Sequence, residues 1–163
     1  MFLVEKLPTF LYNNGSFIDT NTEDIIMANV KELLKAEENG SLSFGDYSLP
    51  QKTKLDEFSF EGDVYKVKTF QEITRLEKNG GVVYESVPGS AVHGYKETER
   101  QIAFETEAAD DLQITLEVEP EKEYKVFVND TNIGKLKSSL GGKISFSIEL
   151  DAGETAKVQV VKL

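Results

Sequence analysis

The strongest constraint on this chain is a strict alternation of apolar and polar residues in three runs of its last third. The polar positions hold Gln, Thr, Ser, Lys and Glu. A period of two is what a β-strand with one buried and one solvated face requires. The apolar positions are Leu112, Ile114, Leu116 and Val118, then Ile144, Phe146, Ile148 and Leu150, and finally Ala156, Val158 and Val160.

Turn signals divide residues 101–163 into six short segments, which together predict a six-stranded antiparallel β module. Asn129-Asp130 suits the positive φ angles of a tight hairpin, and Gly134 suits a bulge. Short strands at regular spacing are typical of a β-sandwich or an open barrel. The side chains expected in the core are Phe104, Leu116, Val126, Phe146, Ile148 and Val158.

Residues 27–100 predict a helix followed by a β-hairpin module. Val30, Leu33 and Leu34 have helical spacing, so one short N-terminal helix is expected over residues 28–38, with Asn39-Gly40 ending it. Strands are expected at 41–44, 56–60, 64–70 and 82–87. Residues 71–78 favour one or two helical turns, and residues 90–100 favour a polar connection between the halves.

Residues 1–26 show no period that lasts, and two interpretations stay open for them. They form an irregular extension, or they are a mis-called translated leader ahead of a natural start at Met27. The second interpretation is supported by Thr22-Glu23-Asp24, because these residues can be encoded by codons that contain a ribosome-binding sequence shortly before the Met27 codon.

The charge balance argues against nucleic acid as a partner. The chain of 163 residues carries a formal net charge of −11 and has no cluster of Lys and Arg to contact phosphates. It has no Cys, which excludes disulfides and thiolate metal sites. No apolar run approaches the roughly 20 residues of a membrane span. The expectation is a soluble, acidic, cytoplasmic protein without a membrane partner.

Few residues indicate catalysis or a cofactor. Asp110 with Asp111, and Glu61 with Asp63, are carboxylate pairs of the kind a glycosidase needs, but turn acids in water explain them better. His93 is the only His, so a two-His metal site is excluded. Two groups offer oxygens to Ca²⁺ without the EF-hand spacing: Asp19, Asn21 and Asp24, and Asn129, Asp130 and Asn132. No catalytic residue, cofactor or metal ligand is predicted.

Aromatic residues give the only candidate ligand surface. Tyrosines can support a sugar ring, although the chain lacks Trp. Tyr in alternating strands is more often half-buried in a core. The tyrosines available are Tyr47, Tyr65, Tyr84, Tyr95 and Tyr124. The candidate ligand or interaction surface consists of Tyr65, Tyr84, His93 and Tyr95.

Several segments resemble a family of short bacterial proteins from gut anaerobes that carry the automatic label "endosialidase". The resemblance covers roughly residues 27–163, supports Met27 as the start, and implies no characterised activity. The segments are Met27-Ala-Asn-Val-Lys-Glu-Leu-Leu-Lys, Gly40-Ser-Leu-Ser-Phe-Gly-Asp-Tyr, Asp63-Val-Tyr-Lys-Val-Lys-Thr-Phe, Tyr84-Glu-Ser-Val-Pro-Gly and Val126-Phe-Val-Asn-Asp.

The residues disfavour the activity that this label names. Sialidases hold the sugar carboxylate with three arginines, because the planar guanidinium binds a carboxylate bidentately. This chain has only Arg75 and Arg100. The sequence therefore favours a non-enzymatic interaction or structural module with an unknown protein partner or self-association. The alternative is a carbohydrate-associated module. An exposed row of tyrosines on one sheet face favours the alternative, and an exposed apolar helix face or paired edge strands favour the first hypothesis.

Overall fold

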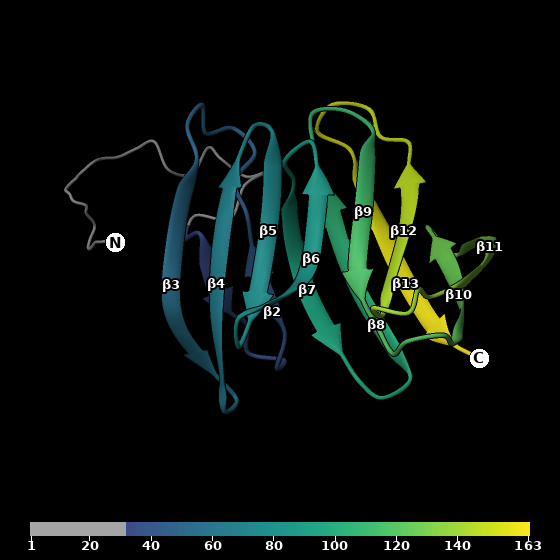
Figure 1. Cartoon of the computed structure of the whole chain (residues 1–163). Helices are drawn as coiled ribbons and strands as arrows, with labels where there is room; N and C mark the ends of the chain where they lie inside the picture. Colours follow the sequence, from purple (N-terminus) through teal and green to yellow (C-terminus); the bar gives the residue numbers. More distant parts are fainter. Residues whose placement is uncertain (1–31) are drawn as a thin grey trace.

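The computed structural model describes residues 32–163, which form thirteen β-strands (Figure 1). Every described strand pairs with an antiparallel neighbour. The strands are β1 (Leu34–Ala36), β2 (Leu42–Phe44), β3 (Thr53–Phe60), β4 (Asp63–Phe70), β5 (Ile73–Lys78), β6 (Gly81–Val87), β7 (Ala91–Glu97), β8 (Gln101–Glu107), β9 (Leu112–Glu117), β10 (Glu123–Val128), β11 (Thr131–Lys137), β12 (Lys143–Ile148) and β13 (Thr155–Lys162).

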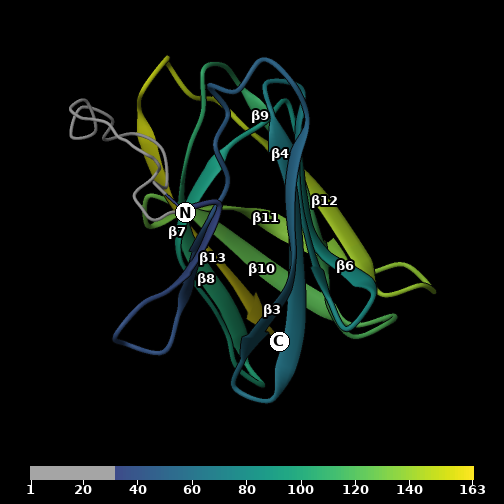
Figure 2. The ribbon, with the colours of Figure 1, turned by 90° about the vertical axis from the view of Figure 1, so that its left-hand side faces the viewer.

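The strands form two sheets that face each other as the layers of a sandwich (Figures 1 and 2). The seven-stranded sheet has the order β1-β2-β7-β8-β13-β10-β11. The six-stranded sheet has the order β12-β9-β6-β5-β4-β3. The described residues therefore form a mainly β structure of two antiparallel sheets, and they do not close into a barrel.

The alternating runs of the last third do line the space between the sheets. The six residues predicted as core are all buried, which confirms that prediction. Each strand turns its apolar side to the opposite sheet and its polar side to water, as the period of two requires. All six strands predicted in residues 101–163 are present, and the hairpin turn between β10 and β11 has positive φ at Asn129 and Asp130.

The predicted helix is not seen where the structure describes it. Residues 34–36 form strand β1, which pairs with β2 through a turn containing Gly40 at φ +83°. The Asn39-Gly40 signal that was expected to end a helix is equally suited to a hairpin, and here it makes one. Residues 28–31 lie outside the described residues, as does the whole of the predicted extension or leader at 1–26.

Two expectations for residues 71–100 are wrong. Residues 73–78 form strand β5 instead of helical turns, because β4 and β6 pair with its two sides. Ile73 and Leu76 are three apart, which mimics helical spacing, but in the strand they face opposite sides. Residues 91–97 form strand β7, in which a bulge near Gly94 breaks the alternation that would have revealed it.

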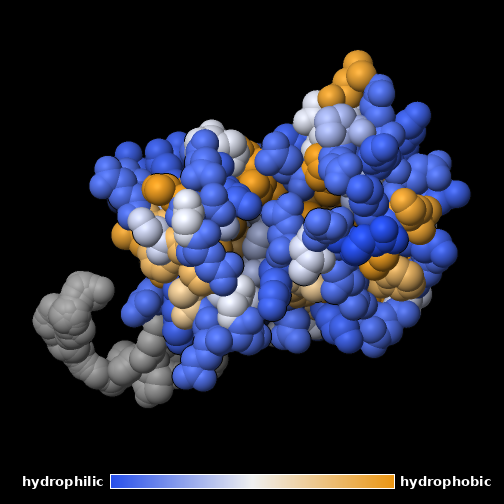
Figure 3. Space-filling view, turned by 90° about the horizontal axis from the view of Figure 1, so that it is seen from below, coloured by the Kyte–Doolittle hydropathy of each residue, from blue (hydrophilic) through white to orange (hydrophobic). Residues whose placement is uncertain are grey.

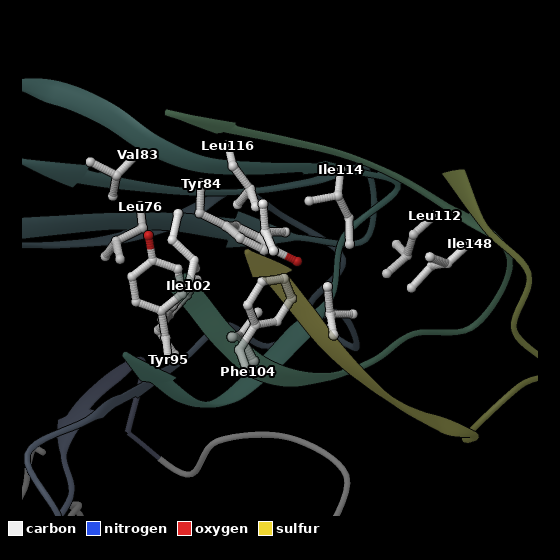
Figure 4. Packing of buried hydrophobic residues seen from close by; sticks show 14 of the residues in the cluster. Leu76, Val83, Tyr84, Tyr95, Ile102, Phe104, Leu112, Ile114, Leu116 and Ile148 are labelled. Atoms are coloured by element: carbon white, nitrogen blue, oxygen red, sulfur yellow. The ribbon is translucent and has the colours of Figure 1, made fainter. Parts of the chain in front are cut away.

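The two segments predicted as modules share both sheets. The six-stranded sheet contains β9 and β12 from the second segment and β3, β4, β5 and β6 from the first. The seven-stranded sheet contains β8, β10, β11 and β13 from the second segment and β1, β2 and β7 from the first. One continuous hydrophobic cluster draws its side chains from both segments (Figure 4).

The two ends of strands β4, β5 and β6 differ in how closely the backbone packs. At the packed end, at the top of Figure 1, a Cβ built on Gly89 would lie 1.9 Å from Phe70 O, and one on Gly45 would lie 2.4 Å from Ser90 O. At the opposite end of these three strands, the open end, a Cβ on Gly62 or Gly80 would meet nothing within 4 Å. Farther along the same side, beside β9 and β12, the backbone is close again, because a Cβ on Gly142 would lie 2.5 Å from Val118 O.

Candidate functional site

Tyr84 belongs to a network of buried hydrogen bonds that connects the turns at the packed end. Its buried hydroxyl lies 2.8 Å from Ser90 Oγ, which lies 2.7 Å from Ser86 Oγ. Thr74 Oγ1 donates to Ser90 O and accepts from Ser90 N, both at 2.9 Å, and it lies 2.8 Å from Thr69 Oγ1. Burial raises the pKa of Tyr84, so its hydroxyl stays protonated. Each of these polar groups has a partner, which indicates a structural role.

Tyr95 differs, because its hydroxyl has no partner among the described residues. The residue is 5% exposed, and its Oη is the one buried side-chain oxygen or nitrogen of residues 32–163 without a hydrogen bond. The Tyr95 hydroxyl points across the space between the sheets toward Leu76 and Val83, away from the Tyr84 hydroxyl (Figure 4). A buried hydroxyl without a partner costs free energy, so its surroundings need explanation.

Tyr95 is one of the residues that line a cavity of about 160 Å³ at the open end, although its hydroxyl oxygen is buried. Hydrophilic side chains cover most of this end, with hydrophobic residues visible between them (Figure 3). The cavity lies between the turn that joins β3 to β4 and the end of β7. Its lining consists of Gly40, Leu42, Phe60, Glu61, Asp63, Tyr65, Lys78, Val83, Tyr95, Lys96 and Glu97.

Negative charge exceeds positive charge in this lining. Three carboxylates, those of Glu61, Asp63 and Glu97, face two ammonium groups. Both ammonium groups have partners: Lys78 Nζ lies 3.7 Å from Asp63 Oδ2, and Lys96 Nζ donates to Asn39 O at 3.2 Å. Within residues 32–163 the carboxylates of Glu61 and Glu97 have neither a hydrogen bond nor an ion pair. Both side chains are exposed, so water solvates these two carboxylates.

The pKa shifts at the cavity agree with this excess of negative charge. Burial raises the pKa of Tyr65, and the carboxylates of Asp63, Glu97 and Glu61 raise it further. Glu97 lies exposed at the rim, yet partial desolvation raises its pKa, with Lys78 opposing the rise and Glu117 and Asp63 adding to it. Burial also raises the pKa of Tyr95, so its hydroxyl is a proton donor at neutral pH.

His93, the fourth residue of the predicted surface, lies apart from the three tyrosines. It is half-buried on β7 and borders an open depression of about 640 Å³ with residues of β1 and β2. The predicted residues therefore divide between two places. Tyr65 and Tyr95 line one cavity, Tyr84 lies in the core beside Tyr95 with ring centroids 6.4 Å apart, and His93 lies elsewhere.

The remaining tyrosines do not form an exposed row either. Tyr124 is buried, and its hydroxyl accepts a hydrogen bond from Glu119 N at 3.0 Å. Tyr47 is half-buried and donates to Glu107 Oε2 at 3.2 Å. Burial and the Glu107 carboxylate raise the pKa of Tyr47 to about 12. These hydroxyls are engaged within the protein.

The other residues considered for chemistry have structural surroundings. Asp111 Oδ1 accepts from Leu150 N at 2.9 Å, and Asn129 Oδ1 accepts from Lys157 N at 2.9 Å. Arg75 Nε pairs with Glu85 Oε1 at 3.2 Å, whereas Arg100 lies in the turn between β7 and β8. Over residues 32–163 no group of three His, Cys, Asp or Glu side chains is placed to hold a metal ion. Asp19, Asn21 and Asp24 lie outside the described residues.

Comparison with protein-family models, curated proteins and solved structures finds no match to this chain. The part of the chain from residue 32 onward has no helix that is long and apolar enough to cross a membrane.

Sequence reasoning missed the charged rim of the cavity. Lys78, Lys96 and Glu97 come from strands β5 and β7, which the sequence did not predict. Glu61 and Asp63 were noticed as a carboxylate pair, and their hairpin turn brings them to the same cavity. The missing information was the pairing of strands far apart in the sequence, which no local spacing carries.

Proposed function

We propose that this chain is a non-enzymatic binding module that pairs strand β12 with an extended segment of a protein partner. The observation that supports the proposal is the free side of β12. This strand makes an uninterrupted ladder of six residue pairs with β9, and no strand of residues 32–163 lies on its other side. A regular strand with unpaired backbone groups is a template for another chain.

The other three edges of the two sheets are protected in ways that β12 is not. Strand β1 has three residues. Strand β3 is interrupted by a bulge between Leu55 and Phe58, and β11 is opposite a register shift at Val126 and Phe127. Both also carry exposed charged side chains. Short strands, bulges and edge charges are the means by which proteins discourage edge pairing.

Strand β12 has only one charged residue, and its side chain does not cover the free edge of the strand. Lys143 Nζ donates to Val82 O on β6 at 2.6 Å, so its ammonium points back across the sheet. Ser145 and Ser147 are small and exposed. Leu140, in the loop before β12, is 80% exposed and offers an apolar contact next to the strand. An extended segment would gain backbone hydrogen bonds from β12 and apolar contact from Leu140.

The carbohydrate-associated alternative has no specific observation in its favour. An exposed row of tyrosines on one sheet face would favour it. Four of the five tyrosines considered for it are buried: Tyr65, Tyr84, Tyr95 and Tyr124.

The proposal is tested by hydrogen exchange on the protein bound to partners captured from its host. Wild-type bait and a Ser145→Lys/Ser147→Lys variant are compared, with Ser59→Lys on the opposite edge of the same sheet as the control. The expected result is partner-dependent amide protection in residues 143–148, with capture lost in the double variant and kept in Ser59→Lys. Ultracentrifugation over a range of concentrations separates a second copy from a different partner.

Two outcomes would contradict the proposal. One is capture that survives both lysines on β12. The other is protection that appears on β3, β11 or the open end while residues 143–148 exchange as in the free protein.

A further inference from the structure

The sequence of edge strand β12 reads the same in both directions. Residues 144–148 are Ile-Ser-Phe-Ser-Ile, with Phe146 at the centre. When two copies of one strand pair antiparallel about a residue, positions equally distant from that residue lie opposite each other. Pairing about Phe146 therefore places isoleucine opposite isoleucine and serine opposite serine, and it brings the two Phe146 residues together. The strand is complementary to itself in this register.

The match holds on both faces of the sheet. Directly opposite residues of antiparallel strands share a face, and their side chains interact. Ile144, Phe146 and Ile148 form the buried side of β12, so apolar residues of the two copies would meet on that side. Ser145 and Ser147 are exposed, so hydroxyl groups would meet on the outer face. Aromatic pairs and serine pairs of this kind stabilise a sheet.

The backbone groups that this register needs are on the free side of β12. Those of Lys143 point away from β9, because Lys143 O accepts from Ser139 N at 3.0 Å and Lys143 N donates to Ser139 Oγ at 3.1 Å. The hydrogen-bonding direction alternates along an antiparallel strand, so the backbone groups of Ser145 and Ser147 also face the free edge. In pairing about Phe146, each Ser145 would exchange two backbone hydrogen bonds with Ser147 of the other copy.

The loop before β12 limits the length of an added strand. Ser139 occupies the place next to Lys143 on the free side, so a partner strand can pair only from Ile144 onward. Strand β12 itself ends at Ile148, so a second copy supplies a paired segment of matching length. Lys143 of one copy would lie at the same end as Glu149 of the other, which puts charges of opposite sign at both ends of the ladder.

The other long edge strands do not match themselves in this way. Pairing of β11 about its middle residue, Gly134, would place Ile133 opposite Lys135. Pairing of β3 about Glu57 would place a leucine opposite a serine. Self-complementarity is therefore a property of β12 among these three edges.

We propose that the extended segment bound by β12 is β12 of a second copy of this chain, paired antiparallel about Phe146 with two-fold symmetry. This inference rests on the proposed function, because it names the partner of the same edge. The six-stranded sheets of the two copies form one continuous sheet across the interface. Leu140, which is 80% exposed and adjoins Ser139 at the free side, lies beside the end of the second copy's β12 and loses contact with water there.

Sedimentation of the purified full-length protein tests the association. The ladder is short and two chains of charge −11 repel each other, so we expect a weak dimer with a Kd of about 10–500 µM, tighter at high salt. Ser145→Lys/Ser147→Lys is expected to weaken the dimer at least about tenfold, because the new lysines of the two copies face one another. Ser59→Lys on β3 is expected to leave the Kd unchanged.

Single cysteines report the register, since the chain has no native Cys. Ser145→Cys and Ser147→Cys proteins are mixed and mildly oxidised, with one of them ¹⁵N-labelled so that mass spectrometry distinguishes the products. Pairing about Phe146 brings the Cα atoms of the two different cysteines to about 5.5 Å, which a disulfide spans, and leaves like cysteines about 7–8 Å apart. The mixed disulfide is expected to form at least about tenfold faster than either symmetric one.

Three results would overturn the inference. The first is a monomer at concentrations up to about 1 mM. In that case, protection of residues 143–148 by a captured partner would leave the proposed function standing with a different partner, and its absence would contradict both proposals. The second is a dimer that keeps its Kd in Ser145→Lys/Ser147→Lys, which would place the interface elsewhere. The third is a symmetric disulfide that forms fastest, which would show a register not centred on Phe146.

Discussion

At the packed end the hydroxyl of Tyr84 bonds to Ser90, whereas the hydroxyl of Tyr95, whose ring centroid lies 6.4 Å away, has no partner within residues 32–163. The two rings meet edge to face in the same aromatic cluster with Phe44 and Phe104. Equal burial therefore gives two different outcomes. The difference lies in what each hydroxyl faces: a backbone turn rich in Ser and Thr for Tyr84, and the apolar side chains of Leu76 and Val83 for Tyr95.

This comparison separates structural polar groups from candidate functional ones. A satisfied buried network contributes to stability and to a unique arrangement of the turns it joins. An unsatisfied buried hydroxyl lowers stability. Removing a partner of the Tyr84 hydroxyl is thus expected to cost stability, whereas removing the Tyr95 hydroxyl is not.

The largest effect is expected from Gly89→Ala at the packed end. The new Cβ would lie 1.9 Å from Phe70 O, a backbone atom that cannot rotate away. We expect a loss of at least about 3 kcal/mol in the free energy of unfolding, or failure to fold. Gly81→Ala, whose Cβ would have Lys78 O as its nearest neighbour at 3.8 Å, is the matched control at the open end. Urea unfolding that gave the two variants similar stability would remove the distinction between the ends.

A smaller effect is expected from Ser90→Ala. The substitution takes a partner from the Tyr84 hydroxyl and from Ser86 Oγ, so it should cost about 1–3 kcal/mol. Ser147→Ala removes an exposed hydroxyl of β12 and is expected to change stability by less than about 0.5 kcal/mol. Thermal unfolding followed by circular dichroism measures both, and a stable Ser90→Ala variant would show that the network is dispensable.

The smallest effect is a dependence of stability on pH at the open end. Burial raises the pKa of Glu97, so the folded state favours its protonated form. That contribution is present at low pH and is lost as the pH rises through the pKa of Glu97 in the folded protein. Glu97→Gln is therefore expected to raise Tm by about 1–2 °C at pH 7. The gain should vanish at about pH 3, below the ordinary glutamate pKa. A gain that persists at low pH would have another cause.

The strands of the last third were predictable because one face of each is buried and the other is solvated. Leu112 to Leu116 and Ile144 to Ile148 alternate without interruption, and each turn between strands carries Gly, Pro, Asn or Asp. Strand β7 was hidden because a bulge puts Val92 and Tyr95, both buried, three residues apart. Strand β1 was hidden because Leu33 and Leu34 also suit a helix, and only pairing with β2 decides between the two.

The candidate site was less predictable than the fold. Tyr65 and Tyr95 were named from their residue type, but nothing local in the sequence shows that one cavity receives both. Their meeting depends on β4 and β7 belonging to different sheets that face each other. The charges of Lys78 and Glu97 join them only through the same arrangement. Sequence patterns of short range report which face of a strand is buried, and they do not report which strands face one another.

The most direct test of the comparison is the free energy of unfolding of Tyr84→Phe and Tyr95→Phe, measured by urea denaturation. Each substitution keeps a buried ring and removes one hydroxyl. We expect Tyr84→Phe to lose about 1–2 kcal/mol, because it breaks the bond to Ser90. Tyr95→Phe should stay within about 0.5 kcal/mol of wild type or gain stability, because its hydroxyl has no bond to lose. Equal losses in the two variants, or a larger loss for Tyr95→Phe, would contradict the account.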